Sequence, residues 1–412
     1  MEKFILNNKI EALIKENKST PRSAVVLYAK LNKDEEKCGT NCLMTQLLLQ
    51  GTEKRTSEQL ATELDENAID IDIEKKADYI RLKLLCLNED IETGLEILSD
   101  ILFNSTFSDY EKEKIKIKGE LEADLDSPKI TAQDEYYRTI FKNHPYGTGR
   151  KEILNSIDSI TKEDILSAYN DLKYVLEKNI SFAGDIEPNR IKELFEKYFG
   201  GLKEEKKEST RKKVEPLTKN LVSVIEKEDA NQAQIFKGWN IEGIHSEDYP
   251  AILLINTILS SLGLSSRLFL ELREKRGLAY TVRGVFETYE SGGHYFVYIA
   301  TEPKNINVSI EGFDVEMNKI MNEYVSDEEI ENAKNSAIGK RQFYKETNIS
   351  EANLNGCYEC LKLGYDFEEK LIERVKNLTK EDILKTAAKY FSKPSALCVL
   401  APKKYLEDAN LL

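Results

Sequence analysis

The chain has 412 residues, too many for one ordinary domain, so its length predicts two or three domains. Apolar residues make up 41% and charged residues 32% of it, as expected for a globular protein with a substantial core. The 73 Asp and Glu residues outnumber the 59 Lys and Arg residues, which gives a formal net charge of −14. This acidic excess argues against nucleic acid and anionic membranes as partners.

Features that would direct the chain to a membrane or out of the cell are missing from the sequence. It contains no run of 18 apolar residues, so we expect no membrane span. The apolar stretch within Met1 to Lys9 is too short for a secretory signal. We interpret the six cysteines as reduced thiols, and we therefore expect a cytoplasmic protein.

The first half of the chain alternates between strand and helix patterns. Residues 25–29 read Val-Val-Leu-Tyr-Ala, which predicts a strand, and the apolar run that follows predicts a helix. Pro128 ends a long charged helix, and His144 opens a turn. In chain order we expect strands at 22–31, 68–73, 77–86 and 179–185, and helices at 39–50, from 57, 90–103, 109–124, 136–142, from 161, and 188–200.

A highly charged segment separates the two halves. Residues 203–216 are nearly all charged and have no apolar periodicity, which is typical of a linker between domains. We therefore expect an N-terminal domain at 1–202 and a C-terminal domain at 217–412.

The second half repeats the pattern of the first. Thr161 to Leu166 reads Thr-Lys-Glu-Asp-Ile-Leu, and Thr379 to Leu384 reads the same. A helix and then an apolar strand follow each copy, so duplication explains the match better than chance does. The fold class is α+β, with two homologous domains, each an antiparallel sheet backed by helices.

The most distinctive stretch of the sequence runs from Arg267 to Tyr280. Leu268, Phe269 and Leu272 fall at helical spacing, Gly277 ends the helix, and a strand starts at Tyr280. The Arg273 guanidinium and the Tyr280 hydroxyl could converge on a peptide carbonyl, a carboxylate or an oxyanion. The ordinary alternative is a charged surface helix that leads into a buried strand.

This stretch resembles the second-domain signature of the pitrilysin/insulinase family of zinc peptidases, which includes the mitochondrial processing peptidase. The resemblance extends over almost the whole chain and implies two homologous αβ domains, with pairs of chains closing into a hollow chamber. In that family the matching Arg and Tyr hold the substrate backbone and stabilise the tetrahedral intermediate. By resemblance these roles fall on Arg273 and Tyr280.

The family's zinc motif, His-x-x-Glu-His, is degenerate in this chain. Cys42 stands at the first His, Thr45 at the catalytic Glu and Gln46 at the second His, whereas Glu120 matches the distal metal-binding Glu. A catalytic zinc needs three protein ligands, an open position and a base, so we expect no working zinc site. Residues 66–72 also replace two glycines and a polar strand of the family, which argues against ordinary peptide binding along that edge.

The other candidate ligands are scattered. Only three histidines are present, and His144, His245 and His294 lie too far apart in sequence to share a helix face. We interpret His144 as a turn residue and His294 as a structural residue of a strand. Cys357 and Cys360 have redox spacing but no second pair of this kind, and we interpret them as residues of a helix.

Three hypotheses remain open. In the first, the chain is the non-catalytic subunit of a heterodimeric zinc peptidase, with no cofactor of its own. A homologous partner would carry the zinc and His-x-x-Glu-His, and Arg273 and Tyr280 would act on peptide substrates in trans. In the second, it is a non-enzymatic assembly or peptide-binding protein. In the third, it is active through an unusual metal site built on Cys42 and Glu120.

Overall fold

The computed structural model describes residues 1–205 and 208–412, which form two compact units. Unit 1 comprises residues 1–120, 153–211 and 342–367, and unit 2 comprises residues 121–152, 212–341 and 368–412. The units therefore depart from the domain boundaries expected from sequence, because each unit takes a segment from the other half of the chain. Of the expected linker, residues 206–207 lie outside the described residues, and residues 208–216 form neither helix nor strand.

Unit 1 is built on a six-stranded mixed sheet. The strands lie in the order β1-β2-β6-β3-β5-β4, and all neighbours are antiparallel except β2 and β6, which are parallel. Their bounds are β1 (Glu2–Ile5), β2 (Glu11–Glu16), β3 (Arg22–Lys30), β4 (Asp70–Lys75), β5 (Tyr79–Leu87) and β6 (Glu177–Gly184). Both β3 and β6 are buried over almost their whole length, so the core of the unit lies around them.

Unit 2 repeats this plan with five strands. The order is β7-β11-β8-β10-β9, and here β7 and β11 form the parallel pair. The bounds are β7 (Leu221–Glu226), β8 (Ala233–Ile241), β9 (Thr281–Thr288), β10 (Gly293–Thr301) and β11 (Ser395–Ala401). The sheets expected to be antiparallel are thus mixed, because the strand that comes last in the sequence of each unit inserts in parallel orientation, β6 beside β2 and β11 beside β7.

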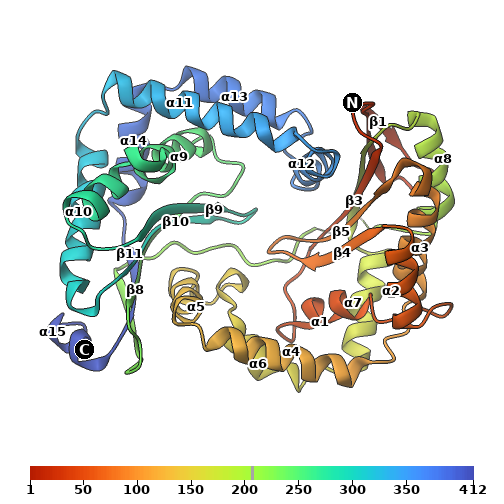
Figure 1. Cartoon of the computed structure of the whole chain (residues 1–412), viewed down its shortest axis with the longest axis horizontal. Coiled ribbons are helices and arrows are strands. Elements are labelled where there is room, and N and C mark those ends of the chain that lie inside the picture. The colour runs from red at the N-terminus through yellow and green to blue at the C-terminus, as the bar shows by residue number, and fades with distance from the viewer. Residues whose placement is uncertain (206–207) are drawn as a thin grey trace. The chain divides into compact units, whose positions relative to one another are not determined.

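Fifteen α-helices are found in the described part of the chain (Figure 1). In the first half they are α1 (Thr40–Leu47), α2 (Ser57–Glu66), α3 (Ile91–Asn104), α4 (Tyr110–Leu125), α5 (Pro128–Ile140), α6 (Arg150–Ile157), α7 (Lys162–Tyr174) and α8 (Pro188–Phe199). In the second half they are α9 (Tyr249–Asn256), α10 (Ile306–Asn322), α11 (Asp327–Gln342), α12 (Asn348–Cys360), α13 (Phe367–Asn377), α14 (Lys380–Phe391) and α15 (Lys403–Asp408). Among the described helices, none combines the length and the apolar character that crossing a bilayer requires.

The repeated sequence forms the same local structure twice. Thr161 caps α7 and Thr379 caps α14, and in each case the third helical residue, Asp164 or Asp382, closes a reciprocal capping box. The Asp side chain accepts from the backbone N–H of the capping Thr at 2.7 Å in α7 and 2.8 Å in α14. Each helix leads into the strand that completes the parallel pair of its unit, β6 beside β2 or β11 beside β7, so the duplication predicted from sequence is confirmed.

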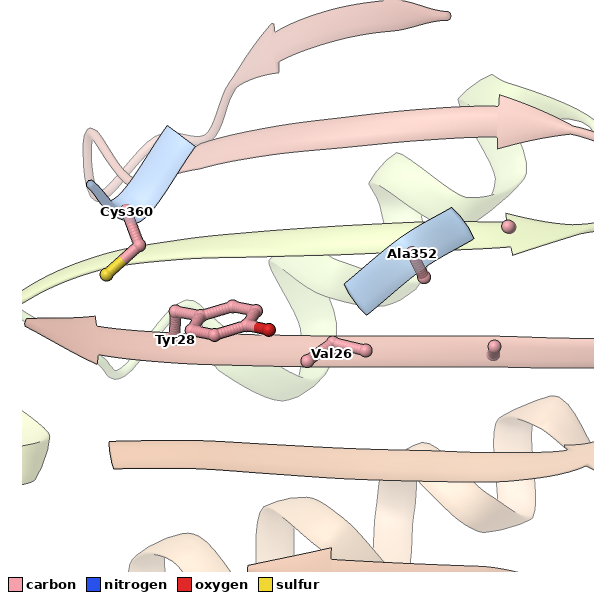
Figure 2. Packing of buried hydrophobic residues seen from close by; sticks show 6 residues of the cluster. Val26, Tyr28, Ala352 and Cys360 are labelled. Carbon is pink, nitrogen blue, oxygen red and sulfur yellow. The ribbon is translucent and has the colours of Figure 1, made fainter. Parts of the chain in front are cut away.

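Two helices cover the sheet of the unit built by the other half of the sequence. In unit 1, α12 lies on β3 and β6, and in unit 2, α5 lies on β8 and β11. Figure 2 shows Ala352 and Cys360 of α12 over Val26 and Tyr28 of β3, and all four side chains are buried. The Tyr28 hydroxyl also donates to the Asn353 side-chain oxygen at 2.8 Å, which anchors the helix to the strand.

Most elements lie where the sequence predicted them, with shifts of a few residues at their ends. The N-terminal hairpin of β1 and β2 was not predicted, and α5 begins at Pro128, eight residues before the expected Tyr136. Pro128 breaks the preceding helix and at the same time opens the next one, because proline fits the first turn of a helix.

Candidate functional site

The segment that carries Arg273 is a π-helix, η5 (Phe269–Lys275), in unit 2. Leu268 and Leu272 are fully buried and fix one side of it to the core. At its start, Arg267 makes a bidentate ion pair with Glu329 of α11, with N···O distances of 2.6 and 2.7 Å. A bidentate pair holds a guanidinium in one orientation, so the entry to η5 is firmly placed.

A tight turn joins η5 to strand β9. Gly277 has φ 62°, a left-handed conformation that favours glycine, and a Cβ there would meet nothing within 4 Å. The Leu278 N–H donates to the Leu272 carbonyl at 2.9 Å, and the Thr301 hydroxyl donates to the Leu278 carbonyl at 2.6 Å. The turn therefore folds the chain back so that Tyr280 returns towards η5.

The structure brings Arg273 and Tyr280 into contact. Arg273 Nη1 donates to the Tyr280 carbonyl oxygen at 2.9 Å, and the guanidinium carbon lies 4.6 Å from the centre of the Tyr280 ring. The Tyr280 side chain is otherwise open to solvent, with 82% of the residue exposed. An arginine fork and a phenol hydroxyl are thus presented at one exposed place.

Phe269 is a member of this group that the sequence reasoning did not include. Its ring centre lies 4.8 Å from the Arg273 guanidinium carbon, so the guanidinium contacts two aromatic rings. Phe269 precedes Arg273 by four residues, a spacing that brings side chains together on a helix. That spacing was visible in the sequence, but Phe269 was assigned to the apolar face.

The helix that corresponds to the zinc motif is α1 in unit 1. Gly39 precedes it with φ 93°, and a Cβ at that position would lie 2.7 Å from the Ile153 side chain. The Glu35 carboxylate accepts hydrogen bonds from free backbone N–H groups at the start of α1, those of Gly39 at 3.1 Å and Asn41 at 2.6 Å. The Gly39 turn and Glu35 therefore fix the start of α1.

The side chains on α1 do not form a hydrolytic site. Burial raises the pKa of the Cys42 thiol. Thr45 is buried, and its hydroxyl donates back to the Cys42 carbonyl at 2.9 Å. Glu120 is largely exposed, and Gln46 is half-buried.

These residues do not fit a catalytic zinc. Zinc requires a deprotonated thiol, whereas burial favours the neutral thiol of Cys42, and Gln46 offers only a weak oxygen ligand. Thr45 cannot act as the base that activates water. Within residues 1–205 and 208–412, no group of three or more His, Cys, Asp or Glu side chains is arranged to hold a metal ion.

The histidines and the Cys-x-x-Cys pair have structural surroundings. His294 is fully buried on β10, where it contacts Tyr136 Oη through Nδ1 at 3.1 Å and Glu287 Oε2 through Nε2 at 3.2 Å. His144 lies in the expected turn, and its Nδ1 accepts from the Tyr146 N–H. Cys357 and Cys360 lie on α12, as predicted, and burial raises the pKa of both thiols.

Comparison with known proteins identifies the family. Residues 12–151 match the insulinase family, peptidase family M16, and residues 159–337 match the peptidase M16 inactive domain. The uncharacterized zinc protease YmxG of Bacillus subtilis is 25% identical over 410 residues, which are 98% of each chain. The probable inactive metalloprotease YmfF of the same organism is 24% identical over 392 residues, covering 88% of this chain and 89% of YmfF.

Solved structures share the whole fold. The peptidase M16 inactive domain structure from Pseudomonas fluorescens superposes with a TM-score of 0.90 at 19% identity and covers 98% of both chains. A protease from Helicobacter pylori gives a TM-score of 0.88 at 17% identity, covering 97% of this chain and 99% of its own.

The fold is therefore that of the M16 peptidases, and the chain belongs to this insulinase family. Cys42, Thr45 and Gln46 replace the His, Glu and His of its catalytic motif, which makes the chain a non-catalytic member.

Proposed function

We propose that this chain is the non-catalytic subunit of a heterodimeric zinc peptidase. A homologous partner that carries His-x-x-Glu-His holds the zinc and activates the water. The present chain contributes half of the peptide-enclosing chamber, together with Arg273 and Tyr280, which act at the partner's zinc site.

The observation that carries the proposal is the difference between the two sites. In unit 2, Arg273 and Tyr280 lie in direct contact at an exposed position. In unit 1, the positions of the zinc ligands hold Cys42 and Gln46. A chain that has lost its metal ligands but keeps an arginine and a tyrosine in contact is suited to serve a metal held elsewhere.

The chemistry follows from the donors that this arrangement leaves available. A guanidinium carries five N–H donors, and one of those on Arg273 binds the Tyr280 carbonyl. The others, with the Tyr280 hydroxyl, can donate to the carbonyl oxygen of a bound peptide and to the oxyanion that forms when water attacks it. Donors fixed before the reaction stabilise the transition state more than the ground state.

The test is co-expression with a homologous chain that carries His-x-x-Glu-His. We expect a co-purifying complex with zinc-dependent peptidase activity, and we expect Arg273→Ala or Tyr280→Phe to lower kcat about 10²-fold. Lys275→Ala is the matched control, because Lys275 is an exposed cation on the same helical segment and should leave kcat unchanged. Normal cleavage by the Arg273→Ala complex would contradict the role of that residue.

The second candidate is a peptide-binding or assembly protein without any hydrolytic partner. Similarity to a relative named as a probable inactive metalloprotease favours it. If no chain with the intact motif co-purifies, and the protein still binds peptides, this second function is the correct one.

A further inference from the structure

The two sheets match strand for strand except at one end. Their orders, β1-β2-β6-β3-β5-β4 and β7-β11-β8-β10-β9, coincide when β1 is set aside, so β7 of unit 2 corresponds to β2 of unit 1. In unit 1, β1 adds to the outer edge of β2 in antiparallel orientation. Among the described strands, none adds to β7 in the same way. Unit 2 therefore has an uncovered edge at the place where unit 1 has an antiparallel strand.

The difference at this edge shows in the burial of the two corresponding strands. The central residues of β2, Ala12, Leu13 and Ile14, are fully buried. In β7, by contrast, no residue is fully buried, and Val222 is 56% exposed. A further strand beside β7 would cover apolar side chains that the chain itself leaves open to water.

The backbone groups of alternate β7 residues point away from the sheet. Lys227, which follows β7, donates its N–H to the Ala401 carbonyl oxygen of β11 at 3.1 Å, so the odd-numbered residues of β7 face β11. Val222, Val224 and Glu226 therefore direct their N–H and C=O groups outward. Within residues 1–205 and 208–412, no other segment hydrogen-bonds to these outward groups. Such an edge is a template for another strand.

The side chains of β7 do not protect this edge. The strand reads Leu-Val-Ser-Val-Ile-Glu, with a single charged residue at its end. The end strands of unit 1 differ, because β4 carries Asp70, Asp72 and Glu74, and β1 has only four residues and begins with Glu2 and a lysine. Short or charged edge strands resist pairing with another chain, whereas an apolar edge strand favours it.

The charges that flank β7 are suited to a second copy of the same strand. Lys219 precedes β7, is exposed and forms no ion pair within the part of the chain that the structure describes. The end of the strand carries Glu226, Glu228 and Asp229 against the single cation Lys227. Antiparallel pairing of two β7 strands brings the basic start of each near the acidic end of the other, whereas parallel pairing brings like charges together.

We propose that β7 is a dimer interface, at which two copies of this chain pair as antiparallel strands about a two-fold axis. Val224, the middle one of the outward-facing residues, lies on the axis opposite Val224 of the second copy, and Val222 lies opposite Glu226 of the second copy. Strands exchange hydrogen bonds where outward-facing residues meet, and centring the register on Val224 pairs the whole of β7. This interface goes beyond the proposed function and needs no catalytic partner.

Sedimentation equilibrium of the isolated full chain tests for the dimer. We expect a dimer that dissociates on dilution. Val222→Lys places a charge on the exposed edge, and Val224→Pro removes an outward N–H while keeping the bonds to β11. Each should weaken the dimer at least about tenfold, because a two-fold axis makes every change count twice. A monomeric parent chain, or a dimer that survives both changes, would overturn the proposal.

The matched control for Val222→Lys is the same change at an exposed valine of a helix in unit 2. Val308 on α10 is 41% exposed, so Val308→Lys should associate as the parent does. Thermal midpoints equal to that of the parent would show that the variants fold. If Val308→Lys weakens the dimer as much as Val222→Lys does, β7 is not the interface.

Disulfide cross-linking tests the register. Val224→Cys places two thiols opposite each other across the axis, with Cα atoms about 5.5 Å apart, a separation that suits a disulfide. Val222→Cys places the two Cα atoms about 13 Å apart, which is too far. We expect mild oxidation to give more covalent dimer with Val224→Cys than with the parent, and no such increase with Val222→Cys. Equal increases for the two variants would contradict the pairing centred on Val224.

Charge reversal tests the orientation of the two strands. Lys219→Glu should weaken the dimer about fivefold at low salt and less at high salt, because exposed ion pairs contribute modestly and are screened. Adding Asp229→Lys to this variant should restore the affinity, since each new glutamate then meets a lysine of the other copy. A double variant that stays as weak as Lys219→Glu would overturn the antiparallel arrangement.

Discussion

Units 1 and 2 share one plan but have kept different parts of the chemistry. In both, a helix with a Thr-and-Asp capping box leads into a strand that forms the parallel pair of the sheet, β6 with β2 and β11 with β7. In unit 1, helix α1 carries Cys42 where the family's motif has a histidine. Unit 2 retains Arg273 and Tyr280 in contact. Packing preserves the frame over hundreds of residues, whereas function depends on a few side chains that can change without disturbing it.

The two units also solve one packing problem in opposite ways. Where α12 meets the unit 1 sheet, the helix supplies Gly356 and the strand supplies Tyr28. Where α5 meets the unit 2 sheet, the helix supplies Tyr136 and the strand supplies Gly238. In each case a large ring needs a glycine opposite it, and which element carries the ring is free to vary.

The largest effect is expected from filling the space at Gly238. A Cβ there would lie 2.0 Å from Tyr136 Oη and 2.6 Å from the Tyr295 carbonyl oxygen, and a backbone atom cannot easily move away. We expect Gly238→Ala to lower the free energy of unfolding by about 3 kcal/mol. Native-state hydrogen exchange in α5 would measure it, with Gly339→Ala in α11 as the control, since a Cβ at Gly339 meets nothing within 4 Å.

The matching change in unit 1 should cost less. A Cβ on Gly356 would lie 2.9 Å from the edge of the Tyr28 ring, which can shift. Alanine also stabilises a helix by up to about 1 kcal/mol relative to glycine. We expect Gly356→Ala to destabilise the α12 region by about 1 kcal/mol, as measured by hydrogen exchange in α12. Gly119→Ala, on the open face of α4, is the control within unit 1. A larger loss for Gly356→Ala than for Gly238→Ala would reverse the comparison.

Removing one tyrosine hydroxyl where α5 meets the unit 2 sheet, and one where α12 meets the unit 1 sheet, should also destabilise the two units unequally. The ionised Glu287 accepts from His294 Nε2, so His294 Nδ1 accepts from the Tyr136 hydroxyl. Tyr136→Phe leaves this buried nitrogen without its donor and should cost about 2 kcal/mol. Tyr28→Phe should cost about 1 kcal/mol, because the Asn353 oxygen still accepts from Arg81 at 2.7 Å. Urea unfolding would measure the loss of stability in each variant. Hydrogen exchange in α5 and in α12 would show which of the two helices is affected.

Acid should loosen the α5 contact of unit 2 before the α12 contact of unit 1. Burial lowers the pKa of His294, so the unfolded chain binds the proton more readily, and stability falls as pH drops below about 6.5. Burial acts to raise the pKa of Glu287, but hydrogen bonds led by that from His294 outweigh it and hold the pKa at about 2. The stability that ionised Glu287 contributes is present above about pH 4.5 and is lost as pH falls towards 2.

The corresponding groups against α12 do not titrate in acid. Burial raises the pKa of Tyr28 and of Cys357, so both stay neutral from pH 7 down to pH 2. Hydrogen exchange at pH 7 and at pH 5 should therefore show faster opening of α5 at the lower pH, with a smaller change in α12. His294→Gln should abolish the difference between pH 7 and pH 5, and equal acceleration of both helices would contradict the assignment.

The smallest effect is expected from metal removal. Because burial keeps the Cys42 thiol protonated and Gln46 is a weak ligand, EDTA should leave the thermal midpoint of the isolated chain unchanged. Metal analysis after dialysis against zinc should find no stoichiometric ion, and Cys42→Ser should behave as the parent does. Zinc bound at one ion per chain and lost in Cys42→Ser would instead support the third hypothesis.

Much of the fold could be predicted from particular residues. The capping sequence at Thr161 and Thr379 indicated both the helices and the duplication, and Gly277 indicated the turn before β9. That Arg273 and Tyr280 act on one ligand stays a prediction. Phe269 was missed because helical spacing shows which side chains share a face, but not which of them support a functional group.

The sequence by itself determined the family, the duplicated α+β pattern and the loss of the zinc ligands, because these depend on residue types at fixed local spacing. Only the tertiary structure decided that α5 and α12 cover the sheets built by the opposite halves and that each sheet contains one parallel pair. An apolar helix face must be buried, but its periodicity is the same against any sheet, so the choice of partner is set by chain connectivity and by long-range packing.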